Sequence, residues 1–302
     1  MADMSAPRVV LVDASVYVFR AWHSMPDEFV DADGHPVNAV HGFLRFLLDL
    51  LQRTRPTHAL VAFDEALESS FRNEFYPAYK ANREPAPEEL KRQFGYCRAL
   101  AAALGLREMA DPRFEADDLI GSALHALRPE GYRGLIVSAD KDLSQLLREG
   151  DEQWDLARDT RWSAAEVHGR YGARPERIAD FLGLTGDAID NIPGVPGIGA
   201  KTASALLDHF DSLDALLERI DELPFLRIRG AKSHAARLRE HRELALLSRR
   251  LATISLDAEV PGRAVDYEVA AVRGDLLDPM LDQLRVGPIT RRRIADWSAS
   301  LA

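Results

Sequence analysis

The 302-residue chain contains a single cysteine, Cys97. An intramolecular disulfide and a zinc site built from several thiolates are therefore excluded. The chain also lacks any apolar run close to the roughly 20 residues that a membrane-spanning helix needs. Its first residues lack the charged-then-apolar pattern of a secretory signal. These absences predict a cytoplasmic protein that does not bind membranes.

An excess of positive charge is also missing, because the formal net charge is −10. A nucleic-acid-binding surface is usually basic. Nine of the 48 acidic residues are expected to gather in one metal site, which leaves 39 acidic against 38 basic residues elsewhere. Local basic patches can then dominate, although a run of charge can equally be a solvated helix face. One basic patch consists of Arg227, Arg229, Lys232, Arg237, Arg239, Arg242, Arg249 and Arg250.

The first half of the chain alternates short apolar runs with helical patterns. Buried strands are predicted at 8–12, 58–63 and 134–137. Helices are predicted at 40–51, 88–104 and 116–127. This alternation is typical of an α/β domain, with a mostly parallel sheet flanked by helices.

The strand patterns fade after about residue 170. Helices separated by Pro and Gly are predicted at 174–184, 200–210, 213–220 and 231–251. We therefore expect an α/β domain at 1–170, an all-helical domain at 171–265 and a less patterned C-terminal tail at 266–302.

Acidic residues follow the predicted strands. Asp13 ends the first strand, Asp64 the second and Asp140 the third. The carboxyl ends of parallel strands lie at one edge of the sheet, where ligands bind in open α/β proteins, so we expect these carboxylates to lie close together. Six further acids lie nearby in the sequence or in the helical half, namely Glu115, Asp117, Asp118, Asp142, Asp187 and Asp190.

A single Asp is more often a helix cap or a turn residue than a metal ligand. Nine converging carboxylates, however, would repel one another strongly unless cations were bound between them. Because every donor is a carboxylate oxygen, the expected ion is Mg²⁺, with Mn²⁺ as a substitute. One Mg²⁺ uses only a few carboxylates, so the number of acids predicts two ions about 4 Å apart.

The chain contains, in this order, LVDASVYVFRAWH, VAFDEALESSFRNEFYPAYKANREP, FEADDLIGSAL, VSADKDLSQLL and LTGDAIDNIPGVPGIGAKTASALL. With these motifs it resembles the 5′-nuclease family, which includes the nuclease domain of bacterial DNA polymerase I, phage 5′-exonucleases and flap endonucleases. The resemblance runs from about Val9 to Leu256 and implies a PIN-like nuclease core. Without a polymerase domain, the chain would be a stand-alone member.

The resemblance implies a structure-specific 5′–3′ exonuclease or flap endonuclease that hydrolyses DNA by a two-metal-ion mechanism. Lys80 and Arg83 would be catalytic contacts to the scissile phosphate, and Arg20 another phosphate contact. A helix turn would place Lys80 and Arg83 on one face. The implied metal ligands, the first five at one ion and the last four at the other, are Asp13, Asp64, Glu115, Asp117, Asp118, Asp140, Asp142, Asp187 and Asp190.

The resemblance also implies an arch over the active site at about 66–95. Aromatic and basic side chains interleave in this segment, as expected of a surface that stacks bases and binds phosphates. Arg72, Tyr76 and Tyr79 are its predicted DNA contacts. From the residues alone, an amphipathic surface helix kinked at Pro77 is the alternative.

A Gly-rich stretch at 194–202 opens into a helix. It is not a Walker A loop, because Ala200 separates Gly199 from Lys201 and no strand precedes it. Glycines before a helix offer backbone N–H groups to a phosphate. The resemblance implies a helix–three-turn–helix motif that binds duplex DNA through Gly194, Gly197, Ile198, Gly199, Ala200, Lys201 and Thr202. It further implies K⁺ bound by the backbone carbonyls of Leu184, Thr185, Pro193, Val195 and Ile198.

A plain Gly/Pro loop between helices is the alternative for this stretch. Two alternative functions also stay open for the whole chain. A DNA-structure-binding module with decayed catalysis would have lost some ligands, whereas all nine positions hold carboxylates. A PIN-type ribonuclease would lack the Gly-rich motif and the helical half. The expected partners are DNA with 5′ flaps, nicks or 5′ ends and, functionally, a DNA polymerase, and the protein itself is expected to be monomeric.

Overall fold

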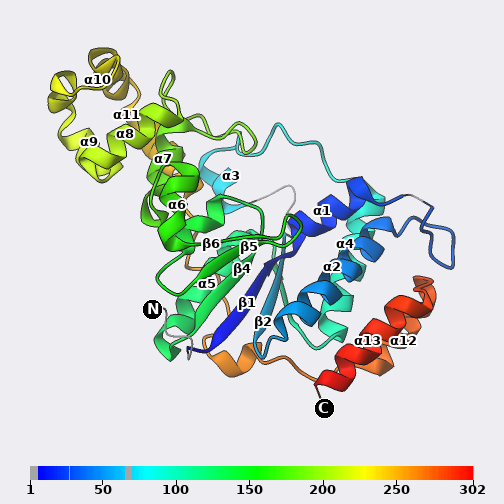
Figure 1. Ribbon diagram of the computed structural model, residues 1–302. Coiled ribbons are helices and arrows are strands. Elements are labelled where there is room, and N and C mark those ends of the chain that lie inside the picture. The colour runs from blue at the N-terminus through cyan, green and yellow to red at the C-terminus, as the bar shows by residue number, and fades with distance from the viewer. Residues whose placement is uncertain (1–5, 27, 65–69, 302) are drawn as a thin grey trace.

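The computed structural model describes residues 6–26, 28–64 and 70–301 (Figure 1). Its centre is a six-stranded sheet in the order β3-β2-β1-β4-β5-β6. The strands are β1 (Arg8–Asp13), β2 (Ala59–Asp64), β3 (Arg107–Asp111), β4 (Arg133–Val137), β5 (Glu152–Asp155) and β6 (Thr160–Ser163). The first five are parallel and only β6 is antiparallel, which confirms the predicted mostly parallel sheet.

The sequence predicted β1, β2 and β4 but missed the other three strands. β1 and β4 are central and read as continuous apolar runs because both of their faces are buried. β3 reads REMAD, while β5 and β6 have four residues each and are largely polar. Such short strands form because a neighbouring strand supplies their hydrogen-bond partners, which a local pattern does not show.

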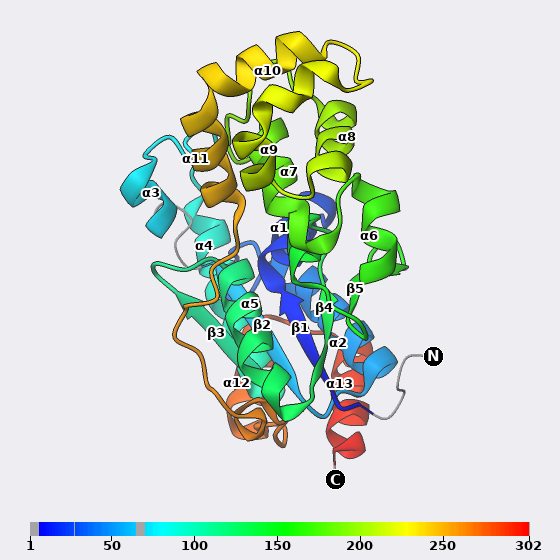
Figure 2. The ribbon, with the colours of Figure 1, turned by 90° about the vertical axis from the view of Figure 1, so that its left-hand side faces the viewer.

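Helices cover both faces of the sheet (Figures 1 and 2). Residues Val10 and Val12 of β1 belong to one apolar core and Val9 and Leu11 to the other, because successive side chains of a strand point to opposite faces. The first core is completed by helices on one face, and the second by a helix on the opposite face. These helices are α1 (Ala14–Ser24), α2 (Asn38–Thr54) and α4 (Glu88–Ala103) on one face and α5 (Ala116–Leu127) on the other.

The core on the α5 side continues without interruption into the helical region. The expected helix at 231–251 is two helices that meet at His241, and the expected helix at 174–184 begins with a 3-10 turn at Pro175–Arg177. The helices of this region are α6 (Ala164–Tyr171), α7 (Ile178–Thr185), α8 (Ala200–Phe210), α9 (Leu213–Glu218), α10 (Ala231–Glu240) and α11 (Arg242–Ala252). None of the described helices has the length and apolarity needed to cross a membrane.

After α11 the chain returns along α5 to the opposite end of the sheet (Figure 2). There α12 (Gly274–Gln283) and α13 (Pro288–Ser300) pack against α4 and α2. The indole of Trp297 is buried and donates a hydrogen bond to the carbonyl of Leu104 at 3.1 Å. The segment expected to be a poorly patterned tail therefore contains two helices and contributes to the core of the α/β region.

Candidate metal and nucleic-acid site

The predicted strand-end acids lie at the edge where the strand order reverses between β1 and β4. Asp13 ends β1 and Asp64 ends β2. β4 ends at Val137, so Asp140 lies three residues beyond the strand and does not end it as predicted. The hydroxyl of Ser138 bonds the carboxylate of Asp13 at 2.8 Å and accepts the N–H of Asp140 at 3.0 Å. This link fixes the loop after β4 beside the end of β1.

Four of the predicted ligands face one another across this edge, and none of them has an ion pair within the described residues. Burial, followed by the charges of Asp64 and Asp140, raises the pKa of Asp13 to about 7. Burial and the charges of Asp13, Asp140 and Asp64 raise the pKa of Asp117 well above its usual range. We call Asp13, Asp64, Asp117 and Asp140 the sheet-edge acids. Their mutual repulsion is the electrostatic condition under which a bound cation stabilises carboxylates.

Two other predicted ligands come from the loop after α7. The carboxylate of Asp187 is paired with the amine of Lys141, and that of Asp190 with the guanidinium of Arg83. Burial alone would raise the pKa of Asp187, but hydrogen bonds from Lys141 and from the N–H of Ile189 bring it below its usual value. We call Asp187 and Asp190 the loop acids.

Asp142 lies between these two groups. Burial and the charge of Asp140, followed by those of Asp187 and Asp190, raise its pKa well above the usual range. Its Oδ1 is buried without a hydrogen-bond partner among the described residues. An unpartnered buried carboxylate oxygen is costly in a finished core, so this atom fits a ligand position.

Lys80 and Arg83 reach the acids from a turn. Helix α3 (Phe71–Phe75) has only five residues, and turns follow it. Lys80 has a φ of +54°, its backbone N–H bonds the carbonyl of Asp190 at 3.0 Å, and its amine lies 2.8 Å from Glu115. The same amine lies 4.0 Å from the carboxylate of Asp190. The two basic residues do converge on Asp190, but not along a helix face as predicted.

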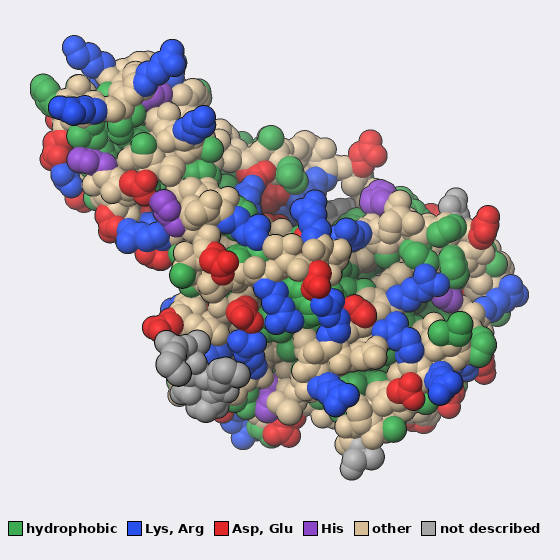
Figure 3. All heavy atoms as spheres, viewed as in Figure 1, with side chains coloured by type: hydrophobic (Ala, Val, Ile, Leu, Met, Phe, Trp, Pro, Cys, Tyr) green, Lys and Arg blue, Asp and Glu red, His purple; other side chains and the backbone are tan. Residues whose placement is uncertain are grey.

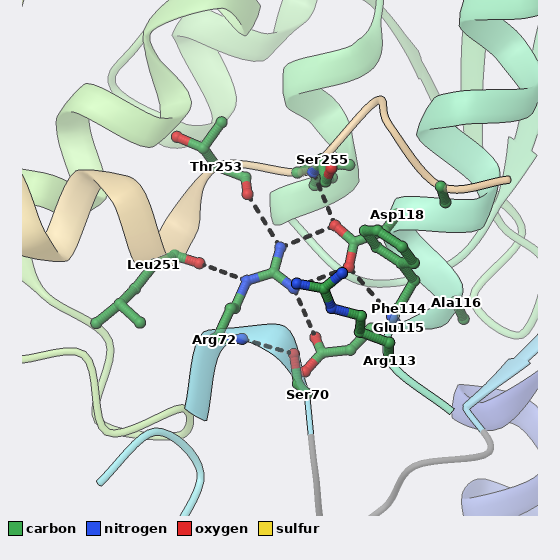
Figure 4. Close-up of polar contacts among 12 residues, drawn as sticks. Ser70, Arg72, Arg113, Phe114, Glu115, Ala116, Asp118, Leu251, Thr253 and Ser255 are labelled. Carbon is green, nitrogen blue, oxygen red and sulfur yellow. Dashed lines mark hydrogen bonds and ion pairs between the residues drawn. The ribbon is translucent and has the colours of Figure 1, made fainter. Parts of the chain in front are cut away.

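Arg72 and Asp118 do not fit their predicted roles. Both side chains are buried, and the guanidinium of Arg72 binds both oxygens of Asp118 at 2.8 and 2.9 Å (Figure 4). Arg72 also donates to the carbonyls of Leu251 and Thr253 at 2.8 and 3.0 Å. The oxygens of Asp118 additionally accept the N–H groups of Glu115 and Ser255. Arg72 is therefore no surface contact for DNA, and Asp118 has no free oxygen to offer a metal.

Three further predicted contacts are Tyr79, Tyr76 and Arg20, and the structure contradicts only the one at Tyr79. Tyr79 is only 4% exposed and its hydroxyl bonds Glu115 at 3.2 Å, so its ring has no free face for a base. Tyr76 is partly exposed and packs on the core. Arg20 is exposed on α1 and lines a pocket with Arg45, and in the described part of the chain it has no ion pair with the nine acids. Residues 66–69 of the expected arch lie outside the described residues.

The Gly-rich stretch forms the loop between α7 and α8. Gly194 and Gly197 have φ values of +63° and +78°, which suit glycine alone without strain. A Cβ at Gly197 would also lie 2.3 Å from the guanidinium of Arg237, which donates to the Gly197 carbonyl at 3.1 Å. Helix α8 begins after Gly199 with neither an acidic residue in its first turn nor a side-chain cap. The first backbone N–H groups of α8 are therefore open, and the exposed Lys201 lies in the same turn. Open N–H groups beside a cation are what an anion site requires.

The carbonyls expected to bind K⁺ surround this loop. Val195 N–H bonds the Leu184 carbonyl at 2.9 Å, and Ile198 N–H bonds the Val195 carbonyl at 3.0 Å. The hydroxyl of Thr185 bonds the Phe181 carbonyl at 3.0 Å. Two of the five predicted carbonyls thus already accept one hydrogen bond and retain a second lone pair each.

The predicted ligands do not yet converge on one point. Among the described residues, the group whose ligand atoms lie within 4.8 Å of one another is Asp31, Asp33 and His35, in a separate loop. Asp31 already accepts the N–H groups of Asp33 and His35 and an ion pair from Arg92, so its oxygens are satisfied by protein donors. The nine acids are more widely spaced. Such spacing suits Mg²⁺, which keeps several of its waters and reaches some carboxylates through them.

Two family models match consecutive segments that together make up most of this chain. The model for the 5′-3′ exonuclease N-terminal resolvase-like domain matches residues 8–172. The model for the 5′-3′ exonuclease C-terminal SAM fold matches residues 173–275. The chain belongs to the 5′-3′ exonuclease family. This confirms the resemblance inferred from the motifs, and the two matched segments correspond to the sheet region and the helical region.

Curated members of the family have similar sequences. DNA polymerase I of Rhizobium leguminosarum is 39% identical over 294 residues, which cover 93% of this chain. The chain spans only 28% of the length of that polymerase. A 5′-3′ exonuclease of Buchnera aphidicola subsp. Acyrthosiphon pisum is 31% identical over 252 residues. The match covers 83% of this chain and 88% of that exonuclease.

Solved structures share the fold at low sequence identity. T5 D15 protein, co-crystallised with metal ions, has a TM-score of 0.66 at 17% identity and covers 98% of this chain and 100% of its own. The catalytic core of Rad2 in complex with DNA substrate has a TM-score of 0.63 at 14% identity, with 96% of this chain and 92% of its own covered. A mostly parallel nuclease-type sheet followed by a helical domain is therefore confirmed as the fold.

Sequence reasoning assigned no role to two residues of the site. Lys141 neutralises a loop acid, and Ser138 holds Asp13 in place. Lys141 is one of five lysines in a chain whose other basic residues are arginines, and this retained lysine inside a motif was the available signal. Ser138 gave no signal, because a serine after a strand is common.

Proposed function

We propose that this member of the 5′-3′ exonuclease family is a structure-specific nuclease that hydrolyses DNA phosphodiester bonds near 5′ ends and flaps. One observation carries the proposal. The sheet-edge acids face one another at the reversal point of a parallel sheet, while Lys80 and Arg83 lie beside them on Asp190. Carboxylates that lack ion-pair partners among the described residues thus lie close to two cationic side chains. This combination suits a metal-bound phosphodiester.

Two divalent ions, Mg²⁺ with Mn²⁺ as a substitute, are the proposed cofactors. When bound, such ions supply an activated water and neutralise charge on the departing oxygen. The unsatisfied oxygen of Asp142 and the raised pKa values at the sheet edge support this donor set. Asp118 is left out because its oxygens are occupied. The remaining proposed ligands are Asp13, Asp64, Glu115, Asp117, Asp140, Asp142, Asp187 and Asp190.

Lys80 and Arg83 are the proposed contacts to the scissile phosphate. In the protein alone their charges rest on Glu115 and Asp190. If Glu115 and Asp190 held a metal ion, Lys80 and Arg83 would be available to hold phosphate oxygens, and their attraction would grow as negative charge builds during hydrolysis. Arg20 is retained as a more distant phosphate contact, because it is exposed on α1, the helix that follows Asp13.

The Gly-rich loop and α8 are the proposed duplex-binding arm. The open N–H groups after Gly199 and the exposed Lys201 support a phosphate contact without base readout. We also propose K⁺ at the carbonyls around Leu184 and Val195. The division into a catalytic domain at 1–170, a duplex-binding domain at 171–265 and a C-terminal segment at 266–302 belongs to this proposal.

The chain spans about a quarter of the DNA polymerase I relatives, so a polymerase partner is a proposal by analogy with them. We also propose, by the same analogy, that the protein is monomeric and cytoplasmic. A ribonuclease of the PIN type is disfavoured, because both exonuclease family models match and the helical region is present. A decayed binding module is disfavoured because all nine predicted ligand positions hold a carboxylate.

The test is cleavage of 5′-labelled DNA with a flap and of a nicked duplex. We expect short 5′-labelled products with Mg²⁺ or Mn²⁺, none with EDTA, and none from an Asp117→Asn variant with Mg²⁺. In parallel reactions, an RNA flap replaces the DNA flap, and Na⁺ replaces K⁺ in the buffer. Equal cleavage with EDTA would contradict a metal-dependent nuclease, and flap binding without cleavage under any divalent ion would favour the decayed module.

A further inference from the structure

The basic patch seen in the sequence divides into two sets. Five of its members have partners inside the protein: Arg237 bonds a carbonyl, Arg239 and Arg249 pair with carboxylates, Arg242 bonds a carbonyl and Arg250 lies over a ring. The other three, Arg227, Arg229 and Lys232, are exposed and have no side-chain partner among the described residues. Only this second set is without a partner in the part of the chain that the structure describes.

These three cations follow an exposed aromatic ring closely in the sequence. Phe225 is 88% exposed and precedes Arg227 by two residues. One exposed apolar side chain is ordinary on a protein surface. An aromatic ring among unpaired cations, however, is the composition of a nucleic-acid contact, because rings stack on bases or sugars while cations bind phosphates. We call Phe225, Arg227, Arg229 and Lys232 the helical tip.

The field around the helical tip is positive although the chain as a whole is negative. Residues 225–232 read FLRIRGAK and contain no carboxylate. The nearest acids in the sequence, Asp221 and Glu222, are already paired with Arg239 and Arg219. Figure 3 shows Lys and Arg side chains gathered over the end of the lobe that carries α9 and α10. A polyanion therefore fits this surface better than an acidic or a neutral partner.

The helical tip is continuous with the Gly-rich loop. Arg237 of α10 donates to the carbonyl of Gly197 in that loop at 3.1 Å, which joins the helix to the proposed phosphate site. Lys232 lies five residues before Arg237, about 7.5 Å along the helix axis. The tip thus begins about 10–20 Å from the loop, a span of about 3–6 base pairs of duplex at roughly 3.4 Å each.

We propose that the helical tip is a second contact to the phosphate backbone of duplex DNA, beyond the phosphate held by the Gly-rich loop. The proposal rests on the proposed function, since it assumes that the loop binds a duplex. It goes further by predicting that the binding surface has a minimum duplex length. A duplex that ends near the loop does not reach the tip, whereas a longer one contacts both.

The experiment measures affinity of the full chain for flap DNA with EDTA, so that no cleavage occurs. The duplex arm either ends at the Gly-rich loop or extends about 20 base pairs beyond it, each arm is closed by a hairpin so that it stays paired, and salt is varied. The test variant is Arg227→Ala with Arg229→Ala and Lys232→Ala. The matched control removes three exposed arginines outside the helical region without a side-chain partner among the described residues, namely Arg55, Arg273 and Arg292.

On the long duplex we expect the tip variant to bind about 10–100-fold more weakly near 0.1 M salt, with the salt slope lowered by about two to three units. On the short duplex, and for the control variant on both, affinity should change less than about twofold. Phe225→Ala should give a smaller loss that is also confined to the long duplex. Unchanged thermal unfolding of the tip variant shows that it folds, as its exposed positions imply.

An equal loss on short and long duplexes, or no loss on either, would overturn the second contact. In both cases the wild-type protein still binds and, with Mg²⁺, cuts flap DNA, so the proposed function stands. Failure of the proposed function is separate and visible, because the wild-type protein would then neither cut the short substrate nor distinguish flap DNA from single strands.

Discussion

The sheet-edge acids and the loop acids carry the same charge but are held in opposite ways. The sheet-edge acids sit at the ends of strands and at the start of a helix, where the backbone fixes them against one another, and burial raises the pKa of Asp13 and Asp117. The loop acids Asp187 and Asp190 are each paired with a basic residue of the α/β region.

The difference indicates that, in the protein without ions, the charges of the two groups are neutralised to different extents. Charge on the loop acids is neutralised by Lys141 and Arg83, and these pairs join the helical region to the α/β region. In the described part of the chain, the sheet-edge acids have no ion-pair partner of this kind. Bound cations should therefore stabilise the sheet edge most, and substitutions in the two groups should have different consequences.

The largest expected effect compares Asp117→Asn with Asp187→Asn. Removing a sheet-edge charge should lower the single-turnover cleavage rate by about 1,000-fold or more, a loss of roughly 4 kcal/mol of transition-state stabilisation. Asp187 shares its charge with Lys141, so its amide should cost only about 10–100-fold. Rates on 5′-flap DNA at saturating enzyme and Mg²⁺ measure both. Equal losses would remove the distinction between the two groups.

A second effect concerns ion pairs at different depth. Arg72→Met leaves Asp118 buried and unpaired, so we expect the free energy of unfolding to fall by about 3–5 kcal/mol. Arg83→Met breaks an exposed pair and should cost less than about 1 kcal/mol. Urea denaturation with EDTA compares them. Adding Asp118→Leu to Arg72→Met should restore much of the loss, and a failure to do so would mean that the carbonyl contacts of Arg72 matter more than the pair.

Lys80→Ala separates rate from affinity. Lys80 is held between Glu115, which lies two residues before the sheet-edge acid Asp117, and the loop acid Asp190. Loss of one such contact to a charge that develops in the transition state should lower single-turnover cleavage by about 100–1,000-fold, with little change in flap affinity. The matched control is Lys201→Ala, which should leave the rate intact. A Lys80 variant that loses affinity and keeps its rate would place this lysine outside the reaction.

Asp13→Asn tests the sheet edge through pH. The folded-state pKa of Asp13, about 7, lies above its ordinary value of 3.8, so the folded protein binds this proton more tightly than the unfolded chain. Its contribution to stability therefore falls as pH rises from about 4 to about 7. In EDTA, the variant should gain about 2 kcal/mol relative to the wild type between pH 5 and pH 8. Saturating Mg²⁺ at pH 8 should reverse this gain, and a pH-independent difference would mean that Asp13 is not repelled by its neighbours.

The smallest effect belongs to Lys201→Ala on the helical side. One exposed phosphate contact should weaken duplex binding about threefold to tenfold near 0.1 M salt and lower the salt slope by about one unit. Titrations on duplex and single-stranded DNA check this. The same loss on single strands would separate Lys201 from the duplex arm.

The central strands and most of the helices could be predicted because their apolar patterns are local. The acids at strand ends could be grouped for the same reason, since parallel strands bring their carboxyl ends to one edge. The short strands β3, β5 and β6 and helices α12 and α13 were missed. Their residues become strands or packed helices only through neighbours far away in the sequence, as Trp297 does through Leu104.

The roles of Arg72 and Asp118 show where sequence reasoning ended. A motif with alternating aromatic and basic residues predicted a DNA-binding surface, and an acid beside other acids predicted a ligand. Both residues are instead partners in a buried pair that also holds the carbonyls of Leu251 and Thr253. The partner segment lies about 180 residues further along the chain, so no local pattern could reveal it.

The sequence by itself determined the fold class, the family and the two acids, Asp13 and Asp64, that end sheet strands, because strand periodicity and motif order are properties of neighbouring residues. Only the tertiary structure decided which charges are neutralised within the protein. Whether an Asp meets an arginine, a lysine or another Asp depends on the packing of α3, α5 and the loop after α7. That packing separates Asp118, whose oxygens are all occupied, from Asp13 and Asp117, whose charges are left for a cation.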